Sequence, residues 1–507
     1  MTDRPAERSA GLDVLSRYTL RADAPAAVKL QHAALAADAL ADTAPELSAR
    51  RGRGRPGRKV VAAIIAAGIA GIAIMQPLPT ALVFVTIMIV AYATTLAHRV
   101  WLMGTALRND ATVYVPDEVA RALPDHELPV YTVLVPAYRE PEVIGDVIAA
   151  IGALDYPADR LDVRLVLEAD DEVTIAAARA TIAGKPIRIV LVPSAEPRTK
   201  PKACNFGLQG APGEFVTVFD AEDRPEPLQL RRAVVALRRL GDGYACVQAR
   251  LGYFNSRQNL ITRWFSIEYA NWFGLLLPGL VSVGAPVPLG GTSNHFHAPL
   301  LRELGAWDAF NVTEDADLGI RLARLGYAVG VLDSLTEEEA NSDFVNWVKQ
   351  RSRWYKGYLQ TWLVHMRSPR AVHRDLGWRG VLGLHLFVLG TPLMALVNPL
   401  FWAMTIVWYA QQPEGIALLF PPSVYYIALF CFLIGNAAVV YMNLVTTRIM
   451  GRPGLMVAAL TVPLYWVMMS AAAAKAVFQL VCTPFYWEKT SHGLDDQPAP
   501  VNEQAAA

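Results

Sequence analysis

Long apolar runs flank a central stretch in which short apolar runs alternate with helical patterns. No Asp, Glu, Lys or Arg lies between Val60 and Ala97, between Val381 and Pro413, or between Gly415 and Thr447. A helix of about 20 apolar residues is long enough to cross the hydrocarbon core of a bilayer. The pattern therefore predicts membrane spans on both sides of a polar region that covers residues 99–378.

The first apolar run is divided by the sequence QPLP at Gln76–Pro79, and basic residues stand at both of its outer ends. Because basic residues favour the cytoplasmic side, residues 59–98 are expected to form a transmembrane hairpin with both ends cytoplasmic. Residues 1–58 are predicted to be a flexible cytoplasmic tail, with an amphipathic helix around Ala26–Leu40.

The second apolar region, residues 379–483, contains two charge-free runs separated by Glu414, and Arg448 and Arg452 follow them. We expect the first run to cross outward and the second to return. The stretch from Leu455 to Cys482 is interrupted by a proline and a lysine, so it is interpreted as interfacial or re-entrant helices. Four spans and a cytoplasmic C-terminal tail, residues 484–507, complete the prediction.

The central region has the alternation of an α/β fold. Four short β-branched runs, at residues 129–138, 161–170, 187–193 and 213–223, are separated by helical patterns such as 142–154 and 226–240. This order predicts βαβ units and a mostly parallel sheet, whose ligands lie beyond the carboxyl ends of the strands. The acidic residues that end these runs are therefore candidates for chemistry: Glu168, Asp170, Asp171, Asp220, Glu222 and Asp223.

Composition narrows the function further. Of 507 residues, 53% are hydrophobic and 18% are charged, which is too apolar for one large soluble enzyme. The formal net charge is zero, which disfavours a nucleic-acid partner. The four cysteines have no CxxC spacing, so neither a zinc site nor a disulfide framework is expected.

Three polar motifs suggest transfer of a sugar from a nucleoside diphosphate. The sequence DAED at 220–223 offers carboxylates for a divalent cation, but an ordinary acidic turn before a helix would have the same sequence pattern. Glu314 and Asp315 stand at a predicted helix start and could supply a general base, or simply begin a helix capped by Thr313. Arg353 offers hydrogen-bond donors for a phosphate group, and Trp354 offers a flat surface for stacking.

The order VPAYREP, ADD, KPKACN, DAED, TED, QRSRW between apolar segments resembles the processive membrane glycosyltransferases of family 2, such as cellulose, hyaluronan and chitin synthases. This resemblance covers about residues 100–490 and implies a GT-A domain between transmembrane helices. It also implies roles for individual residues. The donor nucleotide would contact Pro136, Tyr138, Glu140, Glu168, Asp170 or Asp171, and Lys202. Mg²⁺ or Mn²⁺ would bind Asp220 with Glu222 or Asp223. Asp315, beside Glu314, would be the base, and the acceptor would be held by Gln350, Arg353 and Trp354.

The activity implied is inverting transfer from a UDP-sugar to a growing β-linked polysaccharide, in a bacterial inner membrane and coupled to export, with export proteins as further partners. Two departures leave assignments open, because the metal motif reads Asp-Ala-Glu-Asp and the earlier motif reads EADDE. Single-sugar transfer to a lipid carrier and a catalytically silent membrane subunit remain alternatives. His295 and His297 are expected to line the acceptor pocket, and the terminal PFYWEKTSHG is expected to belong to a cytoplasmic gate.

Overall fold

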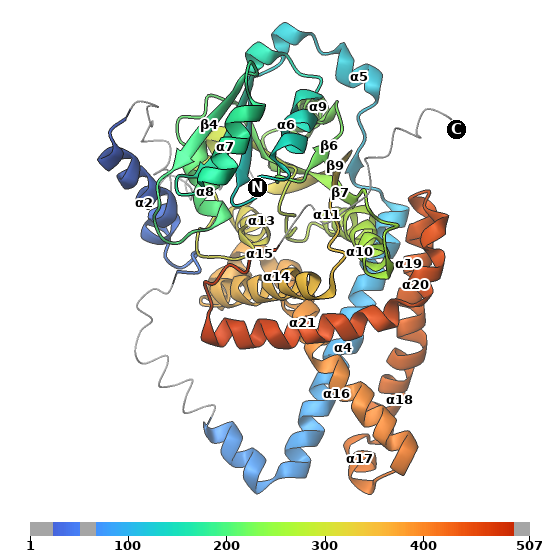
Figure 1. Ribbon diagram of the computed structural model, residues 1–507. Coiled ribbons are helices and arrows are strands. Elements are labelled where there is room, and N and C mark those ends of the chain that lie inside the picture. The colour runs from blue at the N-terminus through green and yellow to red at the C-terminus, as the bar shows by residue number, and fades with distance from the viewer. Residues whose placement is uncertain (1–23, 51–66, 491–507) are drawn as a thin grey trace.

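A computed structural model describes residues 24–50 and 67–490. An α/β domain occupies one end of the molecule, and apolar helices extend from the other end (Figure 1). The predicted basic segment at 51–59 and the start of the first apolar run lie outside the described residues.

Nine strands of the described chain form one sheet, in the order β1-β9-β7-β8-β5-β2-β3-β4, with β6 paired to β9. Strand β8 runs antiparallel to β5 and β7, β6 runs antiparallel to β9, and the other pairings are parallel. The strands are β1 Thr112–Val113, β2 Tyr131–Ala137, β3 Leu161–Glu168, β4 Ile187–Val192, β5 Phe215–Val218, β6 Arg224–Pro225, β7 Tyr244–Tyr253, β8 Asn294–His297 and β9 Ala328–Glu338. The predicted, mostly parallel α/β sheet is confirmed.

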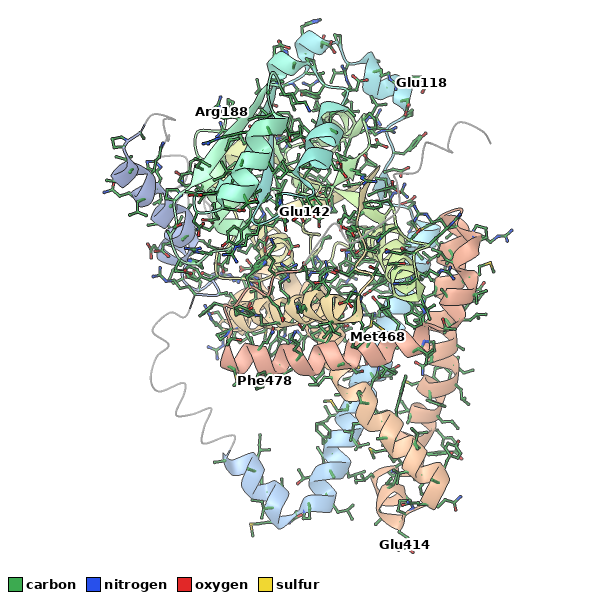
Figure 2. The ribbon with its side chains drawn as sticks, viewed as in Figure 1. Glu118, Glu142, Arg188, Glu414, Met468 and Phe478 are labelled. Carbon is green, nitrogen blue, oxygen red and sulfur yellow. The ribbon has the colours of Figure 1, made fainter. Side chains whose placement is uncertain are left out.

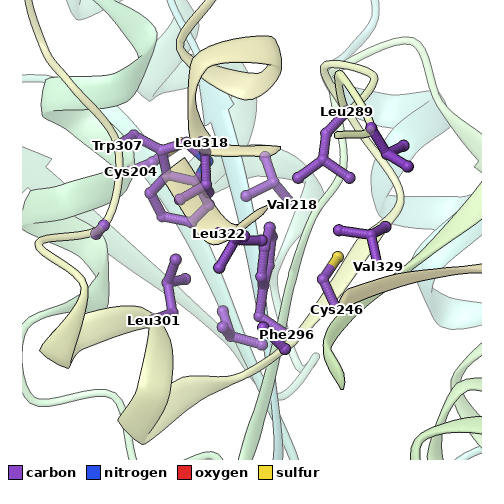
Figure 3. Packing of buried hydrophobic residues seen from close by; sticks show 14 of the residues in the cluster. Cys204, Val218, Cys246, Leu289, Phe296, Leu301, Trp307, Leu318, Leu322 and Val329 are labelled. Carbon is purple, nitrogen blue, oxygen red and sulfur yellow. The ribbon is translucent and has the colours of Figure 1, made fainter. Parts of the chain in front are cut away.

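Helices pack on both faces of this sheet and bury its apolar side chains. Every residue of β2 is buried, as expected of a central parallel strand covered on both faces. On one face, Phe296 of β8 packs near Leu318, Leu322 and Trp307 (Figure 3). The helices of this domain are α5 Asp117–Ala122, α6 Ile144–Gly152, α7 Glu172–Thr181, α8 Lys200–Leu208, α9 Gln229–Leu240, α10 Leu260–Asn271, α11 Leu277–Ser282, α12 Ala298–Glu303, α13 Glu314–Leu325 and α14 Phe344–His365.

Four helical stretches are long and apolar enough to cross a membrane: Pro77–Arg108, Pro369–Gln411, Pro422–Ile449 and Val462–Cys482. The first is α4. The second joins α15 Pro369–Gly383, a π-helical turn and α16 Gly390–Gln411. The third joins α18 Pro422–Phe430, a further π-helical turn and α19 Asn436–Ile449. Short helices α17 Glu414–Leu419 and α20 Met456–Leu460 connect the stretches, and Glu414 lies at the tip farthest from the domain (Figure 2).

The fourth stretch, α21 Val462–Cys482, has a different direction. It lies against α14 and runs across α4 and α16 rather than along them (Figure 1). Phe478 and Val481 on α21 remain exposed. A helix that lies across the bundle with one apolar face uncovered fits the interfacial placement expected for residues 455–482.

The bounds of the apolar helices differ in detail from the predicted ones. Helix α4 forms the second arm of the expected hairpin and continues beyond Ala97 to Arg108. Only the end of the first arm, up to Met75, is helical within the described residues. The two runs on either side of Glu414 are helical as expected, although short turns and π-helical segments interrupt them.

The helix expected around Ala26–Leu40 is present, but it is packed against the domain and does not belong to a flexible tail. Helix α2 Ala26–Thr43 packs against α8, with Ala33, Ala36 and Leu40 buried. Asn205 of α8 donates a hydrogen bond to the Ala36 carbonyl at 2.9 Å. The small alanine side chains that suggested low order allow close approach of two helices.

Candidate active site

A cavity of about 930 Å³ begins at the carboxyl ends of β2, β3 and β5 and reaches the apolar helices. Residues of α4, α10, α14, α16 and α19 line its far end, and residues 485–487, 489 and 490 also line it. This is the edge of the sheet at which ligands of open parallel sheets are expected. Of the predicted residues, the following line the cavity: Pro136, Tyr138, Glu140, Glu168, Asp220, Glu222, Glu314, Asp315, Gln350, Arg353 and Trp354.

The acidic turn after β5 divides its carboxylates between the cavity and the fold. Asp220 and Glu222 line the cavity, whereas Asp223 is fully buried beneath the turn. Asp223 Oδ2 accepts a hydrogen bond from the Asp220 N–H at 2.7 Å and another from the Thr292 hydroxyl. The structure therefore brings Asp220 and Glu222 together at the site and uses Asp223 to fix the turn.

The turn after β5 is a candidate site for a divalent cation. No group of three or more His, Cys, Asp and Glu side chains within residues 24–50 and 67–490 has the arrangement of a metal site. Mg²⁺, however, is often held by one or two carboxylates together with substrate phosphates. Burial and the charge of Asp220 raise the pKa of Glu222 to about 8, and a divalent cation would relieve this unfavourable pairing of acids. Asp220 and Glu222 thus fit a cation that a diphosphate helps to coordinate.

Lys200, rather than Lys202, is the lysine that reaches the site. Lys200 Nζ forms an ion pair with Asp220 and donates to the Gly291 carbonyl at 2.8 Å. Although burial opposes it, the charges of Asp220 and Glu314 raise the pKa of Lys200. Lys202 instead lies fully buried, bonded to Glu168 at 2.8 Å and to the Ala195 carbonyl at 2.8 Å. The two lysines are two positions apart on a helix, so they point in different directions, and the sequence does not indicate which faces the cavity.

A second acidic pair lies at the start of α13. Burial raises the pKa of Glu314 to about 8, with the charge of Asp315 contributing. Burial raises the pKa of Asp315 less, to about 6, because the Ala316 N–H donates to its Oδ1 at 2.7 Å and Lys200 lies nearby. Of this pair, Glu314 has the more strongly raised pKa, so Asp315 is the member that loses its proton more readily. Thr313 occupies the N-cap position, but its side chain makes no capping hydrogen bond.

The QRSRW segment forms part of α14, and four of its residues line the cavity: Gln350, Arg351, Arg353 and Trp354. The Arg353 guanidinium lies 4.5 Å from the Trp487 ring centroid, and the Gln350 amide oxygen accepts from Asn341 at 2.8 Å. Trp354 packs near Tyr269 with ring centroids 6.1 Å apart and nearly parallel planes. A flat aromatic surface beside polar groups is suited to a sugar ring.

Arg351, between the two predicted residues Gln350 and Arg353, has a supporting role that the sequence did not indicate. Its guanidinium binds both carboxylate oxygens of Glu268, one of them at 2.8 Å. It also lies 4.6 Å from the Trp354 ring centroid and donates to the Tyr465 hydroxyl at 3.2 Å. Arg351 therefore fixes Trp354 against α10 and α21.

At the other end of the cavity, the turn after β2 presents Tyr138 and Glu140. Lys489 lies 3.4 Å from the Glu140 carboxylate and donates to the Tyr138 carbonyl. These contacts bring residues of the predicted gate segment next to the predicted nucleotide residues.

Asp170 and Asp171, the two aspartates in the turn after β3, have different partners. Asp171 caps α7, accepting from Thr174 N at 3.3 Å and from Arg139 N at 2.5 Å. Asp170 pairs at 2.5 Å with Arg198, which lines the cavity. Neither Asp170 nor Asp171 lines the cavity itself, whereas Glu168 does.

His295 and His297 do not line the cavity, contrary to expectation. Both belong to β8 inside the sheet, where His295 Nδ1 lies 2.7 Å from the Tyr131 hydroxyl. Burial lowers the pKa of His295 to about 3, so it stays neutral in the core. All four cysteines are free, as expected.

Comparison with known proteins gives two family matches. Residues 132–283 match glycosyl transferase family 2, and residues 215–442 match glycosyl transferase family group 2. A probable glycosyltransferase, YdaM, of Bacillus subtilis is 28% identical over 235 residues, which cover 46% of this chain and 56% of that protein.

Two other relatives have more specific names. A beta-monoglucosyldiacylglycerol synthase of Synechocystis is 29% identical over 308 residues, 60% of this chain and 62% of the relative. Glucomannan 4-beta-mannosyltransferase 1 of Oryza sativa is 29% identical over 237 residues, 45% of each chain. The chain spans about half the length of the curated relatives it matches.

Among solved structures, a mannosyltransferase from Pyrobaculum calidifontis in complex with GDP-Man and Mn²⁺ covers 76% of this chain and 99% of its own, with 21% identity and a TM-score of 0.47. The family matches cover β2 to β5, the acidic turn after β5 and the first helices that follow the domain. The two overlapping matches together run from residue 132 to residue 442, and over this part the chain is similar to glycosyl transferase family 2.

Proposed function

We propose that this protein transfers a hexose from a UDP-sugar to an acceptor hydroxyl at a membrane surface, with inversion at the anomeric carbon. The observation that carries the proposal is the convergence of Asp220, Asp315, Arg353 and Trp354 on one cavity. These residues come from the end of β5, the start of α13 and the middle of α14, so their meeting is not a consequence of neighbouring sequence.

The chain's own residues account for each step. The acceptor hydroxyl attacks the anomeric carbon, its proton passes to Asp315, and the bond from that carbon to the diphosphate oxygen breaks with its electrons left on the diphosphate. Lys200 and Arg353 stabilise negative charge on the leaving group. A Mg²⁺ or Mn²⁺ ion bound by Asp220 and Glu222 would neutralise more of that charge.

Extension of a β-linked polysaccharide is the finer proposal for the product. It is supported by the complete Gln350, Arg353 and Trp354 set and by a cavity that continues from these residues to the apolar helices. Transfer of a single sugar to a lipid is the second candidate, and the similarity to a glycolipid synthase favours it. A silent membrane subunit is disfavoured, because such a protein would have no need of both Asp315 and Asp220 in one cavity.

The decisive experiment incubates the purified full chain with a panel of UDP-sugars, with Mg²⁺ or Mn²⁺, and measures UDP release and product length. The Asp220→Asn variant should lose cation-dependent UDP release, whereas Asp146→Asn, at an exposed carboxylate of α6, should keep it. Retention of cation-dependent release by Asp220→Asn would refute the metal assignment. Products of many sugars support the polymerase, and products of one sugar support the lipid-directed enzyme.

The proposed location is a bacterial inner membrane with the α/β domain in the cytoplasm. In a Cys482→Ser background, a reagent added from outside should label Gln412→Cys, in the turn between α16 and α17, and should not label Arg257→Cys in the domain. The opposite labelling pattern would invert this topology. Export partners and the polymer path remain part of this proposal.

A further inference from the structure

The part of the cavity that lies among the apolar helices contains an arginine without an acidic partner. Arg99 of α4 lines the cavity, and one of its terminal nitrogens donates to the Thr391 hydroxyl at 2.7 Å. Its guanidinium also lies 5.8 Å from the Phe387 ring centroid. The Arg99 Nε is buried and has no hydrogen-bond partner in the described chain.

No carboxylate within residues 24–50 and 67–490 lies within ion-pair distance of Arg99. Glu268 is the acidic residue whose charge acts on Arg99, but Arg351 already binds both of its oxygens. A buried cation is unfavourable unless a counter-charge accompanies it. The missing negative charge is therefore expected to come from a ligand.

The surroundings of Arg99 restrict what that ligand can be. The same part of the cavity is lined by polar groups on the apolar helices: Tyr92, Thr95, Thr391, Asn398, Asn436 and Asn443. The outer surfaces of these helices expose large apolar side chains, among them Ile87, Val90 and Tyr441. A ligand that reaches Arg99 from this side needs both an apolar part and an anionic head.

Arg99 and the proposed base belong to one continuous space. Tyr358 of α14 lines the same cavity as Arg99 and Asp315. Guanidinium groups match the geometry of phosphate oxygens. Asp315, in contrast, is useful only if the attacking group is a hydroxyl that must lose a proton.

We propose that the acceptor is a lipid that carries a phosphate group, which Arg99 binds together with Thr391 while a hydroxyl of the same lipid faces Asp315. This inference rests on the proposed sugar transfer, whose chemistry is unchanged: the hydroxyl loses its proton to Asp315 and the phosphate is only a handle. It is compatible with one transfer or with many on the same lipid.

Binding is tested first, without any donor. The full chain in detergent is mixed with phosphatidylglycerol, with a polyprenyl-phosphate-linked sugar, or with diacylglycerol, which has the hydroxyl but no phosphate. One or both phosphate lipids should bind more tightly than diacylglycerol, and the lipid that binds identifies the source of the phosphate. Arg99→Gln should weaken that binding roughly 10- to 100-fold, since a charge-assisted hydrogen bond contributes on the order of 1.5–3 kcal/mol.

Two control variants separate this role from a structural one. Arg108→Gln removes an exposed arginine at the end of the same helix and should bind like the wild type. Arg99→Lys keeps the charge and should recover part of the affinity. Equal binding of phosphate lipid by Arg99→Gln and wild type would overturn the inference, as would tighter binding of diacylglycerol than of both phosphate lipids.

Turnover then distinguishes this inference from the proposed function. With UDP-sugar and the phosphate lipid, Arg99→Gln should raise the acceptor KM and leave the donor KM and slow UDP-sugar hydrolysis unchanged. A wild type that hydrolyses UDP-sugar but transfers only to soluble oligosaccharides would refute the lipid-phosphate acceptor and leave the sugar transfer intact. If the wild-type protein neither bound UDP nor released it from a UDP-sugar, the proposed sugar transfer would be refuted. The lipid-binding comparison of wild type and Arg99→Gln would still test whether Arg99 binds the lipid phosphate.

Discussion

The carboxylates of the acidic motifs fall into two groups, a partly exposed one that lines the cavity and a buried one that faces the fold. Asp220, Glu222 and Asp315 line the cavity, whereas Asp171, Asp223 and Asp317 bond to neighbouring backbone or to buried cations. Members of both groups occur in the same motif in two places, since Asp223 directly follows Glu222 and Asp317 lies two residues after Asp315. Residue type and spacing thus identify an acidic motif, but orientation decides which of its members can take part in chemistry.

Their pKa values differ for a physical reason. Burial raises the pKa of Glu222 to about 8 and of Asp315 to about 6, although the charge of Lys200 opposes the rise at both. Although burial acts in the same direction on Asp317, a hydrogen bond from His365 and the charge of Arg321 lower the pKa of Asp317. Asp223 is an exception among the inward-facing group, because burial and the neighbouring acids raise its pKa.

The largest expected effect is on Asp315. The Asp315→Asn variant should lose turnover by roughly 10²- to 10⁴-fold, the contribution of a general base, with nucleotide affinity nearly unchanged. UDP release and calorimetric UDP binding measure the two quantities. Loss of UDP binding in this variant would contradict the role of Asp315 as a base.

The next largest effect is on stability and concerns Asp317. Its carboxylate lies 2.8 Å from Arg321 Nε and 3.2 Å from His365 Nε2, and all three side chains are buried. Breaking such a pair leaves an uncompensated buried cation, so Asp317→Asn should destabilise the fold by about 3–5 kcal/mol. Thermal unfolding in detergent should show a clear loss for Asp317→Asn and little change for Asp315→Asn.

The pH dependence of turnover provides a third test. Asp315 accepts a proton only when ionised, so with its pKa raised to about 6 turnover should fall as the pH drops through 6. Below that value the decrease approaches about tenfold for each pH unit, as for any single ionisation. A decrease that begins only near pH 4 would mean that the base is a different or more exposed carboxylate.

The smallest effect is expected for Asp171. Replacing an N-cap aspartate by alanine typically costs about 1 kcal/mol, so Asp171→Ala should lower the unfolding temperature modestly. The donor KM should also rise, because Asp171 fixes Arg139 in the turn that presents Tyr138 and Glu140. Asp170→Ala, which removes only a partly exposed pair with Arg198, should leave stability unchanged and serves as the comparison.

Much of the α/β domain could be predicted from periodicity. The four apolar runs of the first half became β2, β3, β4 and β5 because β-branched residues bounded by turn formers have few other stable arrangements. The packing of residues 24–50 against the domain could not be predicted from periodicity. Helix α2 looks weakly apolar, yet Asn205, Gln209 and Asp308 from distant parts of the chain hold residues 32–49 in place.

The sequence by itself determined strands β2 to β5, the segments that are apolar enough for a membrane, and the motifs that carry acids, lysines and aromatic residues. Only the tertiary structure decided that Lys200 reaches the cavity while Lys202 is buried, and that Asp223 and Asp171 face inward. It also placed Arg99, 216 positions before Asp315 in the sequence, on the same cavity. Local pattern sets the conformation of a segment, but the direction of one side chain depends on partners supplied by other segments, and a linear pattern does not contain those contacts.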